Sequence, residues 1–253
     1  MDPKEFDLIV SLGGSCAVAM QLIWRNMRPF SLPFDWMYMP DEKPVEYLAN
    51  NGFKCGFRDF ALKENLEDVS NTFFSKGYTS PVYYDKLTGY RLMHQFRHPS
   101  INPQWYEKDF AKLHSRFDRL AAVISKCRKV LFCLCTDFTF KNDLVLRLYE
   151  AIVKAYPNVE VHLKVMQFSA GRESESVQQF IDGKVEIVRF ARAASVYDVR
   201  KTSVEWFFLD AISVKACATK KRLSRCEKWL YSIWKHLGKK VKRLGLETNF
   251  IFK

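Results

Sequence analysis

The sequence predicts an α/β fold in which a mostly parallel β-sheet is flanked by helices on both faces, a three-layer arrangement. Two observations carry this prediction. Short apolar runs alternate with stretches of helical periodicity along most of the 253 residues, and such alternation is typical of a parallel sheet covered by helices. In addition, 48% of the residues are hydrophobic and 15% are aromatic, which indicates a folded globular protein with a real core.

The first predicted unit is a strand, a turn and a helix. The apolar residues Leu8 to Leu12 are expected to form a short buried strand, after which Gly13 and Gly14 permit a tight turn. Ser15 is a good N-cap residue for a helix from Cys16 to about Asn26. In a parallel sheet this turn falls at the carboxyl edge, where such folds bind ligands.

The middle of the chain has less regular patterns. Two prolines and several aromatic residues between Arg28 and Met37 predict an ordered loop, and Pro44 to Asn50 is expected to be a short helix. Another helix is expected around Leu62 to Val69. The segments Pro81–Asp85 and Tyr90–Phe96 are expected to form a β-hairpin inserted into the α/β fold.

The second half of the chain returns to regular alternation. Strands are predicted at Val130–Cys135, Val159–Phe168 and Val185–Phe190. Helices are predicted at Trp105–Lys126, Asn142–Ala155, Glu173–Ile181 and Val204–Cys217.

The composition changes near Thr219, so two parts are predicted: an α/β domain of residues 1–218 and a basic tail of residues 219–253. The whole chain has a formal net charge of +12, and the tail alone carries eleven Lys/Arg against two Glu, a local +9. Apolar residues recur there at three- and four-residue steps, which predicts a basic amphipathic helix. Such a helix either lies on an anionic membrane surface or packs on its own domain with a solvated basic face. Nucleic acid is a weak alternative, because the charge is confined to one helix with no recognised binding motif.

The cysteines and the chain start indicate a compartment. The seven cysteines are odd in number and irregularly spaced, so no disulfide framework is predicted, and the absence of a Cys-x-x-Cys motif argues against a structural zinc site. Cys133 and Cys135 are expected to be buried small hydrophobic residues. No secretory signal and no membrane span is recognised. We therefore expect a cytoplasmic protein. It would be peripheral on the inner membrane face if the tail binds membrane rather than packing on its own domain.

Cys16 is the candidate nucleophile. A thiol in the first turn of a helix faces unpaired N–H groups and the positive end of the helix dipole, and both favour the reactive thiolate. A cysteine nucleophile needs a base, usually a histidine. His94, at the end of the predicted hairpin, is the candidate base and His98 is the alternative. Asp35 would orient the histidine, pair with an arginine or bond backbone amides.

The motifs around these residues carry a resemblance. The Ser-Leu-Gly-x-x-Cys-x-x-Ala pattern of Ser11 to Ala19, the Pro33-Phe-Asp-Trp36 loop and His94-x-Phe96 before a basic helix resemble a bacterial domain family of unknown function, described as papain-like cysteine peptidases. The resemblance implies that Cys16 is a nucleophile and His94 its base. The family pattern has Asn before the cysteine and Asp after the histidine, where this chain has Ser15 and Gln95.

A more distant similarity, to capsule-biosynthesis proteins with a Gly-Asn-Cys-Gln turn, implies acyl transfer from coenzyme A. The expected function is thus hydrolysis or acyl transfer, with a cell-surface glycan or its precursor as the substrate. The N–H groups of Gly13, Gly14 and Ser15 would hold an oxyanion or a phosphate. The strand–turn–helix unit also resembles that of hydrolases with a serine in this position, and by that resemblance Ser15 is a fallback nucleophile. The alternative is a non-catalytic glycan- or nucleotide-binding module in which Cys16 is structural.

Overall fold

The computed structural model of the chain describes residues 4–24, 27–51, 53, 58–70, 81–96, 103–169, 176–191 and 212–214. All of these belong to one compact unit. The predictions for His98, for the tail of residues 219–253 and for the boundary between the two parts lie outside the described residues.

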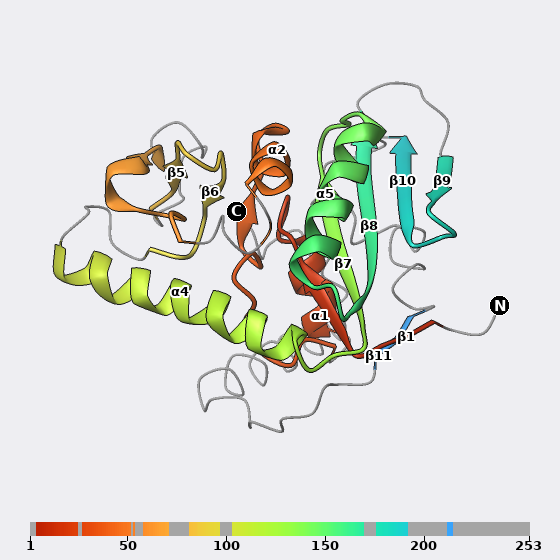
Figure 1. Cartoon of the computed structure of the whole chain (residues 1–253). Coiled ribbons are helices and arrows are strands. Elements are labelled where there is room, and N and C mark those ends of the chain that lie inside the picture. Colours follow the sequence, from red (N-terminus) through yellow and green to blue (C-terminus); the bar gives the residue numbers. More distant parts are fainter. Residues whose placement is uncertain are drawn as a thin grey trace, which may run out of the picture. The chain divides into compact units, whose positions relative to one another are not determined.

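A mostly parallel sheet forms the centre of the described part of the chain, where it has five strands (Figure 1). The strand order is β2 (Leu8–Ser11), β7 (Lys129–Thr136), β8 (Glu160–Ser169), β10 (Val185–Ala191) and β9 (Ser176–Phe180). The first four strands are parallel and β9 is antiparallel to β10. Nearly continuous apolar runs form β2 and β7, as expected for strands buried on both faces. The predicted α/β fold with a mostly parallel sheet is confirmed.

Helices cover both faces of this sheet. The described helices are α1 (Ala17–Trp24), α2 (Lys43–Asn50), α4 (Pro103–Ile124) and α5 (Asn142–Ala155). On one face, Val18 and Leu22 of α1 pack with Ile9 of β2 in one apolar cluster. The next residue, Val10, faces the other cluster, to which α2, α4 and α5 contribute. Because successive side chains of β2 point to opposite faces of the sheet, the strand contributes to both apolar clusters. None of the described helices is long and apolar enough to cross a membrane.

A smaller antiparallel sheet contains the predicted hairpin. In its described part the strand order is β3 (Met37–Tyr38), β6 (Arg91–Leu92), β5 (Tyr83–Asp85) and β4 (Leu66–Asp68). The β5–β6 pair confirms the hairpin, and Asp85 Oδ1 accepts N–H bonds from Leu87 and Thr88 in its turn. Figure 1 shows β5 and β6 on the side of α2 away from β8 and β10. Through β3, this sheet is joined to the loop of residues 33–39.

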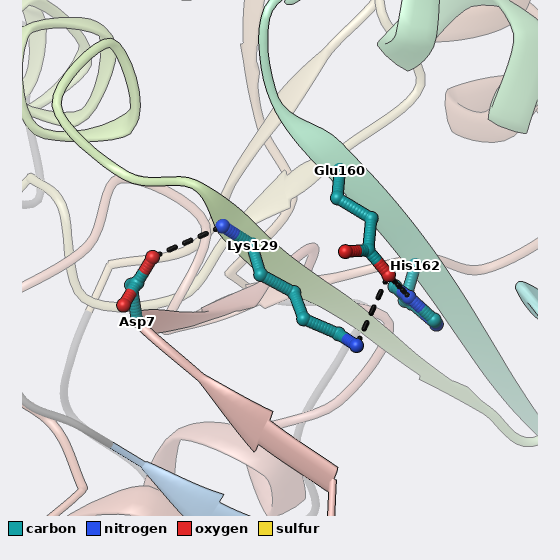
Figure 2. Close-up of polar contacts among 4 residues, drawn as sticks. All are labelled: Asp7, Lys129, Glu160 and His162. Carbon is teal, nitrogen blue, oxygen red and sulfur yellow. Dashed lines mark hydrogen bonds and ion pairs between the residues drawn. The ribbon is translucent and has the colours of Figure 1, made fainter.

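Charged residues tie three neighbouring strands together at the amino-terminal edge of the large sheet (Figure 2). Asp7 Oδ2 accepts hydrogen bonds from the backbone N–H groups of Arg128, at 2.7 Å, and Lys129, at 3.0 Å. Lys129 Nζ lies 3.0 Å from Glu160 Oε1, which is also 2.7 Å from His162 Nε2. The hydrogen bonds from His162 and Lys129 lower the pKa of Glu160. These contacts help to fix the register of β2, β7 and β8.

Three predicted helices are wrong at the residues that the structure describes, while 173–175, 204–211 and 215–217 lie outside them. Residues 176–180 form β9, and the following turn, with positive φ at Ile181, Asp182 and Gly183, returns the chain antiparallel to β10. Within residues 62–69, a 3-10 helix, η2 (Lys63–Asn65), precedes β4. Residues 212–214 of the predicted helix at 204–217 form β11 (Ile212–Val214), parallel to β1 (Lys4–Phe6). In each case a short segment pairs with a strand, and such pairing depends on neighbours that local periodicity does not reveal.

Candidate functional site

The turn after β2 requires glycine at two consecutive positions. Gly13 and Gly14 have φ values of 82° and 85°. A Cβ on Gly14 would lie 2.1 Å from the Cys135 carbonyl oxygen, and one on Gly13 would lie 3.0 Å from the Met37 carbonyl oxygen. The turn is thus held between the end of β7 and the loop of residues 33–39. The Met39 N–H donates a hydrogen bond to Gly14 O at 3.3 Å, which adds to the contact between the turn and the loop of residues 33–39.

Cys16 follows this turn and is partly buried, with a free thiol. Ser15 is buried, and its Oγ accepts the N–H of Ala17, the first residue of α1, at 3.3 Å. The helix begins one residue later than predicted, so Ser15 precedes the N-cap position, which Cys16 occupies. The Gly13 N–H donates to Ser11 Oγ at 3.2 Å. Within the described residues, the N–H groups of Gly14 and Ser15 have no hydrogen-bond partner. These two amides are therefore the candidates for binding an oxyanion.

The prediction that Cys16 rests as a thiolate is wrong. Burial raises the pKa of its thiol to about 11, and the hydrogen bond from its own backbone N–H lowers it only in part. Loss of water around the sulfur outweighs the favourable position at the helix start. Cys16 is therefore a neutral thiol at pH 7, and its reaction as a nucleophile requires a base.

His94 lies just beyond β6, next to Trp36. The two rings meet edge to face, with centroids 5.7 Å apart. The backbone N–H of His94 donates a hydrogen bond to Gln95 Oε1 at 3.0 Å, and the backbone N–H of Met93 donates one to Trp36 O at 3.4 Å. Residue His94 as a whole is exposed, but partial burial of its ring lowers its pKa. Its imidazole is therefore neutral at pH 7 and can accept a proton.

The loop of residues 33–39 anchors both candidate residues. It contacts the Cys16 turn through Met39 and Gly14. Its strand β3 pairs with β6, with Met37 opposite Leu92, and Trp36 contacts the strand end that carries His94. The structure thus attaches the nucleophile and the base to one segment at the carboxyl edge of β2. The approach of the thiol to the imidazole stays a prediction.

Asp35 is fully buried in the same loop. Its Oδ2 accepts the Leu32 N–H at 2.7 Å and lies 2.6 Å from Arg28 Nη2. Burial raises the pKa of Asp35 to about 6, against the opposing effect of Arg28. The Arg28 guanidinium also lies 6.0 Å from the centre of the Trp36 ring. Asp35 thus makes both structural contacts expected from the sequence, a hydrogen bond from a backbone amide and an ion pair with an arginine. Its catalytic role stays a prediction.

Sequence reasoning missed Arg28 and Trp36 as parts of this site. It also missed a polar cluster farther along the same sheet edge, formed by Asn142, Gln167 and Arg189. A signal was present, because Gln167 and Arg189 interrupt apolar strands close to their carboxyl ends. The carboxyl ends of parallel strands share one edge, so these side chains could have been expected to meet.

Three further cysteines lie in the part of the chain that the structure describes. Cys127, Cys133 and Cys135 are buried and form no disulfide, and burial was predicted for Cys133 and Cys135. In the part of the chain that the structure describes, no group of three or more His, Cys, Asp or Glu side chains could hold a metal ion.

One comparison with known proteins agrees with the family resemblance found in the sequence. A family described as a putative papain-like cysteine peptidase (DUF1796) matches residues 7–171. This chain belongs to that family. The matched residues include β2, the Cys16 turn, the loop of residues 33–39, His94 and the strands β7 and β8.

One curated relative comes from a virus. The uncharacterized protein R408 of Acanthamoeba polyphaga mimivirus is 27% identical over 135 residues. The match covers 49% of this chain and 60% of the viral protein. No solved structure matches the chain at a significant level.

Proposed function

We propose that this chain is a cysteine-dependent hydrolase of acyl bonds, with Cys16 as nucleophile and His94 as general base. The observation that carries the proposal is the loop of residues 33–39, which anchors both the Cys16 turn and the strand end that bears His94. Membership of a family described as papain-like cysteine peptidases supports the same chemistry, with a peptide bond as the first substrate to test.

The two pKa shifts define how the first step proceeds. A raised thiol pKa and a lowered imidazole pKa make a resting ion pair unfavourable. The thiol proton therefore moves to His94 while Sγ forms its bond to the substrate carbonyl carbon. The carbonyl oxygen becomes negatively charged and accepts hydrogen bonds from the amides of Gly14 and Ser15.

The remaining steps restore the enzyme. The His94 imidazolium gives its proton to the leaving amine as the carbon–nitrogen bond breaks, which leaves a thioester on Cys16. Water then attacks the thioester with His94 as base, the acid product leaves and the thiol recovers its proton. Acyl transfer is the same scheme with another acceptor in place of water. Coenzyme A, a glycan acceptor and membrane attachment by residues 219–253 stay predictions within it.

An electrophilic peptide probe tests the proposal. A peptidyl vinyl sulfone is expected to label Cys16 in the full chain, as located by mass spectrometry. His94→Asn is expected to slow this labelling by about a hundredfold, the lower end of typical general-base contributions. Cys127→Ala is the matched control, because it removes another cysteine and should leave the rate unchanged. Equal labelling rates with and without His94 contradict the proposal and favour a non-catalytic binding module.

A further inference from the structure

A second feature at the carboxyl edge of the large sheet is a polar pocket. It has a volume of about 400 Å³ and is lined by Glu42, Thr139, Phe140, Lys141 and Arg189. Its walls come from the start of α2, the loop between β7 and α5, and the end of β10. Figure 1 shows the start of α5 at the same sheet edge as the carboxyl end of β10. The volume is in the range of pockets that bind small molecules.

Neutral side chains hold Arg189 in place. Its Nε donates to Gln167 Oε1 at 3.1 Å, and its Nη2 donates to Asn142 Oδ1 at 2.6 Å. Its Nη1 lies 3.5 Å from Gln178 Oε1. Gln167 is fully buried, so this support is rigid. A guanidinium group has five N–H donors, and these three contacts leave one donor on each terminal nitrogen.

The charge of Arg189 is not neutralised by its neighbours. Amide oxygens accept its hydrogen bonds without cancelling its charge, and it forms no ion pair with any described carboxylate. Lys141 adds a second positive charge to the lining, and it too has no ion pair within the described residues. Glu42 contributes one negative charge, so the lining has a net charge of +1. A fixed guanidinium with free donors is the group best suited to bind a carboxylate or a phosphate.

The pocket lies within reach of the Cys16 turn. Glu42 comes three residues after Met39, whose N–H bonds Gly14. Three residues span at most about 11 Å. The lining residue Glu42 is therefore tethered within this span of Met39, which bonds the Cys16 turn, and an extended substrate could reach from the turn to the pocket.

We propose that this pocket binds an oxyanion group, a carboxylate or a phosphate, of the substrate whose acyl bond Cys16 attacks. The link to the reaction rests on the proposed function. The binding of the anion does not, because it depends on Arg189 and Lys141 alone.

Calorimetric titration of the full chain tests the proposal with three probes: inorganic phosphate, glutarate and its neutral analogue glutaramide. We expect phosphate or glutarate to bind and glutaramide not to bind. Arg189→Gln and Lys141→Gln are each expected to weaken binding at least tenfold. Arg147→Gln is the matched control, because Arg147 lies on α5, which follows Lys141, but pairs with Asp143 and does not line the pocket. Its affinity should remain that of the wild type.

Glu42→Gln gives a result that misfolding cannot imitate. Removal of the negative charge is expected to tighten binding about threefold, as estimated for a charge several ångströms away near water. If phosphate binds more tightly than glutarate, the substrate group is a phosphate. If glutarate binds more tightly than phosphate, the substrate group is a carboxylate. Absence of binding by both anions, or binding that Arg189→Gln leaves unchanged, overturns the proposal. If the anions bind but Cys16 is not labelled, the proposed reaction fails and the pocket stands.

Discussion

Gly14→Ala is the most direct test of how the fold holds the Cys16 turn. The new Cβ would lie 2.1 Å from the Cys135 carbonyl oxygen and 2.9 Å from its carbon, at a φ of +85°. The positive φ alone costs a non-glycine residue roughly 1 kcal/mol. The overlap is with backbone of a central strand, so the turn or β7 must move by about 1 Å. Overpacking of this kind costs up to about 3 kcal/mol, which gives a total near 4 kcal/mol.

Gly183→Ala is the matched control for this variant. Gly183 has a similar φ of +76°, but a Cβ there would meet its nearest atom, on the Gln179 side chain, at 3.9 Å. It therefore carries the conformational cost without the overlap, about 1 kcal/mol. In a chain of this size 1 kcal/mol lowers the melting temperature by about 2–4 °C. We expect a loss of about 10 °C for Gly14→Ala and about 3 °C for Gly183→Ala, measured by thermal and urea unfolding. Equal losses would show that the Gly14–Cys135 contact is not as tight as described.

Three further predictions concern buried ionisable groups. Asp35→Asn is expected to destabilise the fold by about 3 kcal/mol, because it leaves Arg28 without its partner. The same substitution should remove a fall in stability as pH rises from about 4 to about 6, since Asp35, with its pKa raised to about 6, binds its proton more tightly in the folded chain. Urea unfolding from pH 4 to 6 measures this pH dependence, and unfolding above pH 7, where Asp35 is ionised, measures the loss of the pair with Arg28. A wild-type profile in the variant contradicts the reasoning. Alkylation of Cys16 by iodoacetamide should rise about tenfold per pH unit from pH 7 to about 10, because burial raises its pKa to about 11; a plateau below pH 9 in mass-spectrometric rates argues against this. The buried Lys164 pairs with Glu186, so Glu186→Gln should cost about 3 kcal/mol, and much of that loss should be recovered when Lys164→Met is added; no recovery in the double variant means that the stranded ammonium is not the cause.

Elements with a strong local signal were predicted well. The helix at Asn142–Ala155 has the predicted bounds, and the strands β7, β8 and β10 lie within one or two residues of their predicted positions. The strands are buried on both faces and the helix is buried along one side, so their apolar residues follow a pattern that can be recognised in the sequence. The turn with Gly13 and Gly14 was also predictable, since few other residues adopt a positive φ.

Elements and properties that depend on partners were not predictable. β9 and β4 are short and become strands only because β10 and β5 offer a pairing edge. The thiol of Cys16 lies at a helix start, as predicted, but its pKa follows from the burial that surrounding segments impose. Asp35 was named from its motif, yet its contacts are set by the loop fold and by Arg28.

The sequence by itself therefore determined the fold class, the parallel strands, the glycine turn and Cys16 as the residue to test. Each of these follows from residue types and their local spacing. Only the tertiary structure decided that Cys16 is a partly buried thiol with a raised pKa, that the loop of residues 33–39 anchors both Cys16 and His94, and that Arg189 and Lys141 line one pocket. These properties depend on desolvation and on contacts between residues far apart in the chain, which no local pattern of the sequence records.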